Sequence, residues 1–252
     1  MKNCAVILAG GEGKRMKSDK PKTLSEVLGR PMLCWVMSAL RKAGIDDICV
    51  VKGFKKECVE EYLSTLDFSV ESVFQAERLG TGHAVMMAKD FLKKHSGNVV
   101  ILNGDAPFMD SKTIEDSLKA HIENDCVATV ISAKVDDPTG YGRIVRDENG
   151  NLRAIVEQKD ADEETLKINE VNSGGFWFDC QLLLSVLDRI KSDNSAKEYY
   201  GRFVPEGYKL LLCKNLFACE QVNEKSACSV PSRRNCRRCG IYGMGGCKGR
   251  NF

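Results

Sequence analysis

The feature that most constrains this sequence is a regular alternation of short apolar runs with longer amphipathic segments. The first run, Cys4–Ala9, is apolar or small throughout and ends in glycines, as is typical of a strand buried on both faces of a parallel sheet. Pro31–Ala43 carries apolar residues at helical spacing, with proline near its start and Gly44 just after its end. This order of strand, long loop and helix predicts an α/β fold.

The alternation continues along the chain and predicts a doubly wound, mainly parallel sheet. Between Tyr141 and Asp179 the rhythm changes to strand-like pieces joined by the turn Asp147–Gly150, whose Asn-Gly predicts a hairpin. This part predicts a small β-rich insertion. The remaining predicted strands are 48–51, 69–74, 99–102, 127–133, 142–145, 152–158 and 175–178, and the remaining helices are 55–66, 82–94, 110–124 and 181–191.

Composition is that of an ordinary globular chain with one large domain, since 43% of the 252 residues are hydrophobic and 29% are charged. The apolar stretch at the start is too short for a signal-peptide core or a membrane span, so we expect a cytoplasmic protein. Basic residues concentrate after position 200, where ten Lys or Arg stand against three acids. The net charge of +2 therefore gives no indication of nucleic-acid binding by the whole chain.

The loop after the first strand, Leu8–Met16, combines three glycines with the cations Lys14 and Arg15. Glycine amides can approach a phosphate closely, so the loop reads as a polyphosphate cradle, although a plain glycine-rich turn stays open for the loop taken alone. It matches neither the G-x-x-x-x-G-K-[ST] phosphate loop nor the three-glycine dinucleotide fingerprint.

Further polar residues lie on the same long loop, as Lys22 does, or after other predicted strands, at the edge of the sheet where open α/β folds bind ligands. Lys22 could neutralise a phosphate, and the amide of Gln75 offers the donor and acceptor that the imide edge of uracil requires. Asp105 stands where a Mg²⁺ ligand is usual in phosphoryl transfer. Helix capping is its alternative role, which Asp110 or Ser111 can fill instead.

Together these segments resemble the nucleotidyltransferases that make nucleotide sugars. Asp136–Ile144, Val156–Ala161 and Val171–Gly174 narrow the resemblance to the uridylyltransferase domain of the bacterial bifunctional enzyme that makes UDP-N-acetylglucosamine. The resemblance spans about residues 4–200. It implies a Rossmann-like fold in which the β-rich insertion binds the sugar.

The resemblance also implies a role for individual residues. A sugar-1-phosphate would attack the α-phosphorus of UTP and pyrophosphate would leave, without a general base. The implied substrates are UTP and N-acetylglucosamine-1-phosphate, with Mg²⁺ as cofactor, no nucleic acid or membrane partner, and a homo-oligomer left open. The implied residues are Arg15 and Lys22 for catalysis; Leu8, Ala9, Gly10, Gly11, Gln75, Gly80 and Thr81 for the nucleotide; Asn103, Gly104, Gly142, Glu157 and Asn172 for the sugar; and Asp105 for the metal.

Two other functions stay open on the sequence alone. One is a nucleotidyltransferase for another sugar phosphate or nucleotide, and the other is a non-catalytic protein that binds a UDP-sugar and carries zinc in its tail. Trp35 and Trp177 lie in apolar segments and are predicted to be core residues rather than base-stacking platforms. His83, near a predicted helix start, is expected to be structural.

The resemblance ends near Tyr200, where the family would continue with a helix, further strands and a linker whose Asn completes the metal site. Residues 201–252 are instead expected to form a basic, cysteine-rich tail, aberrant or disordered, with no segment that completes the sheet and no acetyltransferase β-helix. A reading-frame disruption is the favoured explanation. The alternative is one structural zinc on Cys228, Cys236, Cys239 and Cys247.

Overall fold

The computed structural model describes residues 2–13, 16, 18–77 and 79–187, together with the backbone of 210–214. The chain divides into Met1–Ala218, which holds every described element, and Cys219–Phe252. Arg15, the predicted helix beyond Leu187 and the four candidate zinc cysteines lie outside the described residues, so the predictions made for them stay predictions.

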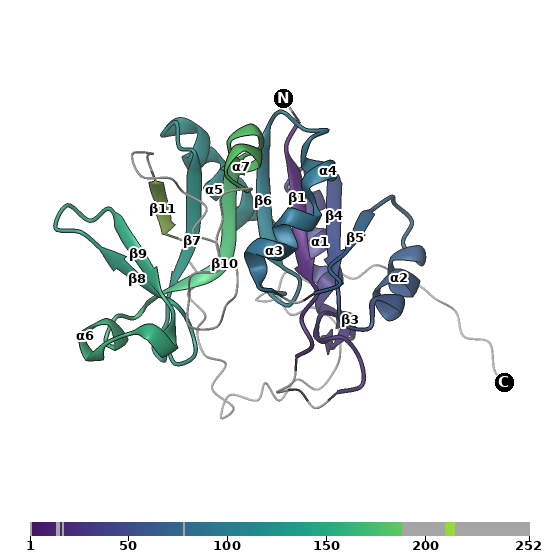
Figure 1. Ribbon diagram of the computed structural model, residues 1–252, viewed down its shortest axis with the longest axis horizontal. Helices are drawn as coiled ribbons and strands as arrows, with labels where there is room; N and C mark the ends of the chain where they lie inside the picture. The colour runs from purple at the N-terminus through teal and green to yellow at the C-terminus, as the bar shows by residue number, and fades with distance from the viewer. Residues whose placement is uncertain (1, 14–15, 17, 78, 188–209, 215–252) are drawn as a thin grey trace, which may run out of the picture. The chain divides into compact units, whose positions relative to one another are not determined.

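A single large sheet forms the centre of the described fold, with strands in the order β11-β7-β10-β6-β1-β4-β5 (Figure 1). β1 pairs in parallel with β4 and β6, and β4 pairs in parallel with β5, as the alternation of apolar runs predicts. The strands are β1 (Cys4–Ala9), β4 (Asp47–Lys52), β5 (Glu71–Phe74), β6 (Asn98–Asn103), β7 (Ala128–Lys134), β8 (Arg143–Arg146), β9 (Leu152–Val156), β10 (Glu170–Asp179) and β11 (Leu210–Lys214), with a separate two-stranded ribbon of β2 (Glu26–Val27) and β3 (Arg30–Pro31).

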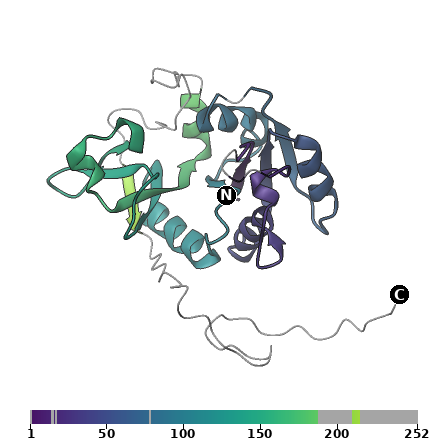
Figure 2. The same ribbon diagram turned by 90° about the horizontal axis from the view of Figure 1, so that it is seen from below.

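Helices cover both faces of the sheet (Figure 2). Successive side chains of a strand point to opposite faces, so Cys4 and Val6 pack under one helical layer while Ala5 and Ile7 pack under the other. All four are fully buried, which explains why the first strand is apolar without interruption. One layer contains α3 (Thr81–Met87), α4 (Lys89–Leu92) and α7 (Cys180–Leu187), and the other contains α1 (Met32–Lys42), α2 (Lys56–Ser64) and α5 (Ser111–Glu123).

The reversed strand β10 joins the parallel sheet to the β-rich insertion. It pairs antiparallel with β6, β7 and β8, and β8 pairs antiparallel with β9. The predicted hairpin between β8 and β9 is confirmed: the Asp147 carboxylate accepts from the amides of Asn149 and Asn151, and Gly150 has a φ of +80°. Figure 1 shows this hairpin, with α6 (Glu163–Leu166) beside it, projecting beyond β7 and β10.

The structure differs from the sequence-based expectations at four places. The predicted helix 82–94 is two helices, because the chain tightens at Ala88, whose amide donates to Val85 three residues earlier. β10 begins at Glu170, ahead of the predicted 175, and contains a register shift between Asn172 and Gly175. Trp177 is a core residue as predicted, whereas Trp35 is only half-buried.

The fourth difference is in the tail, where the expectation that no segment joins the sheet is wrong. Leu210–Lys214 forms β11, which lies parallel to β7 at the edge of the sheet. Its sequence, Leu-Leu-Leu-Cys-Lys, is a short apolar run of the kind that suits a buried parallel strand. The lack of an amphipathic pattern in this segment was therefore no argument against a strand.

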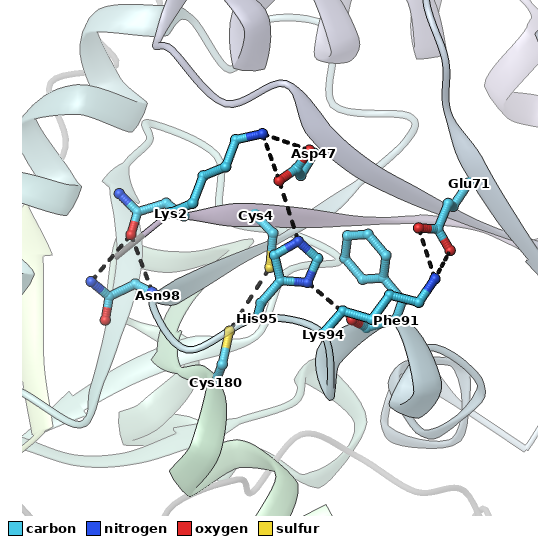
Figure 3. A network of polar contacts seen from close by, with 10 residues as sticks. Lys2, Cys4, Asp47, Glu71, Phe91, Lys94, His95, Asn98 and Cys180 are labelled. Atoms are coloured by element: carbon cyan, nitrogen blue, oxygen red, sulfur yellow. Dashed lines mark hydrogen bonds and ion pairs between the residues drawn. The ribbon is translucent and has the colours of Figure 1, made fainter.

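A polar cluster closes the amino-terminal edge of the sheet, at the start of β1 (Figure 3). The Lys2 ammonium lies 2.9 Å from the Asp47 carboxylate, and His95 contacts that carboxylate at 3.4 Å. The neighbouring thiols of Cys4 and Cys180 are fully buried, with their sulfur atoms 3.8 Å apart. These contacts join β1 and β4 to the start of α7, at the edge opposite to the loops expected to bind ligands.

Candidate nucleotide site

A cavity of about 370 Å³ lies at the carboxyl ends of β1, β5 and β6, the edge where open α/β sheets bind ligands. It brings together eight of the residues expected from sequence to bind nucleotide, sugar or metal, together with Lys22, which was expected for catalysis. Thr23 and Ala84 also line it and were not expected, although Thr23 directly follows Lys22. The lining consists of Leu8, Gly10, Gly11, Lys22, Thr23, Gln75, Gly80, Thr81, Ala84, Asn103 and Asp105.

Two expected residues, Ala9 and Gly104, lie beside the cavity without lining it. Ala9 is buried at the end of β1, and the Gly104 amide donates to the Leu8 carbonyl at 2.9 Å. A side chain at Gly104 would press on the Thr23 methyl group, 3.0 Å from where its Cβ would stand. Both residues therefore hold the strand ends in register at the cavity floor.

Gly10 lies against the Gln75 side chain and the backbone of Gly53. A Cβ there would stand 2.9 Å from Oε1 of Gln75 and 3.6 Å from the backbone of Gly53. A Cβ at Gly53 would in turn stand 2.7 Å from both Cα and O of Gly10. The Phe54 amide donates to the Gly10 carbonyl at 3.1 Å, which fixes the start of the glycine-rich loop against the end of β4.

Gln75, directly after β5, is 5% exposed and donates both of its side-chain N–H groups within the protein. Nε2 lies 3.1 Å from the Gly80 carbonyl and 3.1 Å from Nδ1 of His83. A side-chain amide has only two such hydrogens, so Oε1 is the group left to contact a ligand. The expectation that Gln75 offers both a donor and an acceptor is therefore wrong, because its donors are already used.

Gly80 turns the chain into α3 with a φ of +96°, a backbone conformation that favours glycine. The turn directs its carbonyl toward Gln75 and places Thr81 in the cavity wall. His83, expected only to be structural, contacts Gln75 from the same first turn of the helix. No local pattern in the sequence signals that contact.

Lys22 and Asp105 meet at the cavity, where Nζ of Lys22 lies 2.5 Å from Oδ2 of Asp105. Their side chains are 35% and 29% exposed, so both remain open to a ligand from the cavity side. The cap of α5 is Asp110, whose carboxylate accepts from the Thr113 amide at 2.8 Å. Asp105 is therefore not needed as the cap of that helix.

The donor set at Asp105 fits a Mg²⁺ ion that is shared with a substrate. No group of three or more His, Cys, Asp or Glu side chains that could hold a metal occurs among the described residues. Mg²⁺ commonly uses one or two carboxylates and completes its octahedron with waters and substrate phosphates. One carboxylate at the edge of a phosphate-sized cavity satisfies that pattern, and Lys22 neutralises it when phosphate and metal are absent.

The expected sugar residues form a second group: Gly142 directly precedes β8, Glu157 directly follows β9, and Asn172 lies on β10. Oε1 of Glu157 lies 3.0 Å from where a Cβ of Gly142 would stand, and the Asn172 amide donates to the Gly142 carbonyl at 2.9 Å. Burial raises the pKa of Glu157 above its ordinary value of 4.5. Asn103 connects this group to the cavity. It lines the cavity, and its side-chain amide packs so closely on Gly174 of β10 that a side chain at position 174 would collide with it.

A buried arginine beside this second group was not anticipated. Arg143 is 2% exposed and donates to the Tyr141 carbonyl and, at 3.0 Å, to Oε1 of Gln158. The same Gln158 oxygen accepts from the Gly140 amide at 2.8 Å. These bonds hold the turn before Gly142 against the segment that carries Glu157.

Comparison with known proteins agrees with this geometry. Residues 4–209 match the family of nucleotidyl transferases. The chain is 48% identical over 200 residues to the bifunctional protein GlmU of Clostridium botulinum and 51% identical over 200 residues to that of Clostridium beijerinckii. Each match covers 79% of this chain and 43% of the relative, so the chain spans less than half the length of these curated relatives.

The fold also resembles a solved structure. A chain named as a glucose-1-phosphate thymidylyltransferase from Bacillus anthracis superposes with a TM-score of 0.69, covering 84% of this chain and 87% of the other. The two sequences are 23% identical, so the likeness supports the Rossmann-like α/β fold. In the described part of the chain, no helix has the length and apolar character needed to cross a membrane.

Proposed function

The chain belongs to the nucleotidyl transferase family, and we propose that it transfers the uridylyl group of UTP to N-acetylglucosamine-1-phosphate, releasing pyrophosphate and forming UDP-N-acetylglucosamine. The observation that carries this proposal is the single cavity in which Gln75 presents an acceptor while Lys22 and Asp105 present opposite charges. Such a cavity can read a base at one end and hold phosphates at the other. The GlmU names of the relatives favour UTP and an N-acetylated sugar.

The base end of the cavity suits uracil. Uracil carries an N–H at ring position 3, which can donate to Oε1 of Gln75, whereas the corresponding nitrogen of cytosine is an acceptor. Gln75 is nearly buried, so an unmatched pairing there leaves polar groups without partners and costs affinity. UTP should therefore bind better than CTP.

The phosphate end can stabilise the charge that moves during transfer. The Lys22 ammonium and the amides around Gly10 and Gly11 line the cavity beside the strand ends, and we expect Arg15 to reach the same phosphates. Members of the family generally use a divalent metal. Mg²⁺ held by Asp105 would supply further positive charge to the phosphates.

The sugar end would be formed by the second group, which consists of Gly142, Glu157 and Asn172. The carboxylate of Glu157 and the side-chain amide of Asn172 can hydrogen-bond to sugar hydroxyls or to an acetamido group. The backbone of Gly142, which has no side chain in the way, can lie against the ring. Asn103 and Gly104 would contribute from the floor between the two regions.

The reaction needs no general base from the protein, because the phosphate of the sugar is already an anionic nucleophile. The three histidines agree with this: His83 contacts Gln75, while His95 and His121 lie away from the cavity lining. Placement and charge stabilisation would then provide the rate enhancement.

The proposal includes a cytoplasmic location. The six cysteines of residues 2–187 are free thiols, which is the usual state in a reducing compartment.

Pyrophosphate release from UTP, Mg²⁺ and N-acetylglucosamine-1-phosphate tests the proposal. The Asp105→Asn variant, which keeps the shape but removes the charge, should lower the rate by about a hundredfold or more. Asp116→Asn, an exposed α5 residue paired only with Lys112, is the matched control and should leave the rate unchanged. CTP and glucose-1-phosphate serve as alternative substrates.

The outcomes separate the functions. Release with UTP and the N-acetylated sugar that depends on Asp105 supports the proposal, and faster release with another pair would assign a different nucleotidyltransferase. Absence of release by the unmodified chain, with UDP-N-acetylglucosamine still bound in a calorimetric titration, would contradict catalysis and leave a binding protein.

A further inference from the structure

We infer that His83 is a positioning residue that sets base selectivity, by holding the Gln75 amide so that only its carbonyl oxygen faces the nucleotide base. The inference rests on the proposed uridylyl transfer, because it concerns how the same cavity distinguishes uracil from cytosine. His83 does not line the cavity and acts through Gln75.

The orientation of the Gln75 amide follows from two acceptors on one side of it. The Gly80 carbonyl can only accept a hydrogen bond, so the group 3.1 Å from it must be the Nε2 donor. The second N–H of Nε2 points at Nδ1 of His83, also at 3.1 Å. Nδ1 must therefore carry a lone pair, and the proton of the neutral imidazole lies on its other nitrogen.

On its other side, the Gln75 amide meets a backbone that has no side chain. Oε1 lies so near Gly10 that a Cβ there would stand 2.9 Å away, and both residues line the cavity. The oxygen thus faces the wall of the cavity formed by the glycine-rich loop. A base seated there meets an acceptor.

Rotation of the amide by half a turn would be needed to accept cytosine. That rotation would place Oε1 against the Gly80 carbonyl, which can only accept, and against Nδ1 of His83, which could face an oxygen only after the imidazole had changed its tautomer; both costs fall in a nearly buried site. The carbonyl alone imposes one of these penalties, and His83 adds the second. Removing the His83 acceptor should therefore weaken the discrimination without abolishing it.

The local backbone explains why both acceptors reach one amide. Gly80, with its φ of +96°, is the cap residue of α3, and His83 lies in the first turn of that helix. The Gly80 carbonyl and the His83 side chain, which lie three residues apart at this helix start, both contact Nε2 of Gln75. The backbone amide of Gln75 donates a hydrogen bond to the Lys52 carbonyl at 2.8 Å, which fixes Gln75 opposite these two acceptors.

The experiment compares His83→Leu with His83→Asn. The two replacements have nearly the same size, but asparagine keeps an acceptor close to the position of Nδ1 and leucine has none. Dissociation constants for UDP and CDP are measured by calorimetry on the full chain, and thermal melts check that each variant folds. The ratio of the two constants is the readout, because damage to packing alone would weaken both nucleotides alike.

We expect the unmodified chain and His83→Asn to prefer UDP by similar factors, and His83→Leu to lose about tenfold of that preference. An unchanged ratio in His83→Leu, or equal weakening of both nucleotides, would overturn the inference. Failure of the proposed function looks different, since the unmodified chain itself would then show no preference for UDP.

Nitrogen-15 NMR of the unmodified chain gives a test that needs no variant. The inference requires His83 to be protonated at Nε2 and unprotonated at Nδ1 at neutral pH. A proton on Nδ1 would overturn it, whatever the variants do.

Discussion

His121 should make the stability of this protein fall as the pH is lowered from 7 to 5. The residue is 2% exposed between α5 and the sheet, with Nδ1 2.8 Å from the Thr129 hydroxyl and its ring stacked on Trp177 at 6.4 Å. Burial lowers its pKa from 6.5 to about 4, against a smaller opposing effect of Asp179. Folding therefore keeps this histidine neutral.

The direction of the change in stability depends on whether the folded or the unfolded chain binds the proton first. The pKa is lower in the folded chain, so the unfolded chain is protonated first as the pH falls, and the contribution to stability is complete above pH 6.5 and is lost toward pH 4. Integrating between pH 7 and pH 5 with these two pKa values gives a loss of about 2 kcal/mol. Such a loss should lower the urea midpoint by roughly 1 M.

Urea unfolding of the unmodified chain and of His121→Asn, followed by the fluorescence of Trp35 and Trp177, measures this effect. Asparagine keeps a partner for Thr129 but does not titrate, so the variant should be less stable at pH 7, because of the smaller side chain, yet lose about 2 kcal/mol less on going to pH 5. Carboxylates contribute equally to both proteins and cancel in the difference. Parallel losses of stability in the two proteins would refute the reasoning.

Three further predictions concern the glycines and the carboxylate of the site. Gly53→Ala should cost about 1–3 kcal/mol of stability in a urea titration, because its Cβ would stand 2.7 Å from the backbone of Gly10, while Gly11→Ala, with no atom within 4 Å, should cost far less. Gly142→Ala should weaken UDP-N-acetylglucosamine by about tenfold in calorimetry but leave UDP unaffected, because the methyl group would displace Glu157, and equal loss for both ligands would contradict this. The preference for UDP-N-acetylglucosamine over UDP should decline as the pH falls, beginning above the ordinary range of a glutamate because the pKa of Glu157 is raised, and Glu157→Gln should remove this pH dependence.

Local patterns in the sequence were sufficient to predict most elements of the fold. β1 has the predicted bounds, Cys4–Ala9, and α1 differs from Pro31–Ala43 by one residue at each end. These predictions hold because an apolar run bounded by glycine, or an apolar stripe at helical spacing, reports burial directly. The break of the predicted helix at Ala88 escaped this reasoning, since no change of period marks it, whereas β11 was missed although its apolar run is a strand signal.

The sequence by itself determined which loops line the cavity, because glycines, Lys22, Gln75 and Asp105 each come after a predicted strand and such loops gather at one edge of a parallel sheet. Only the tertiary structure decided what those side chains can still do. Lys22 pairs with Asp105, and Gln75 gives both of its donors to Gly80 and His83, so only its oxygen is left for a ligand. The physical reason is that local periodicity fixes strands and helices, whereas the partners of a buried polar group are fixed by the segments that packing brings against it.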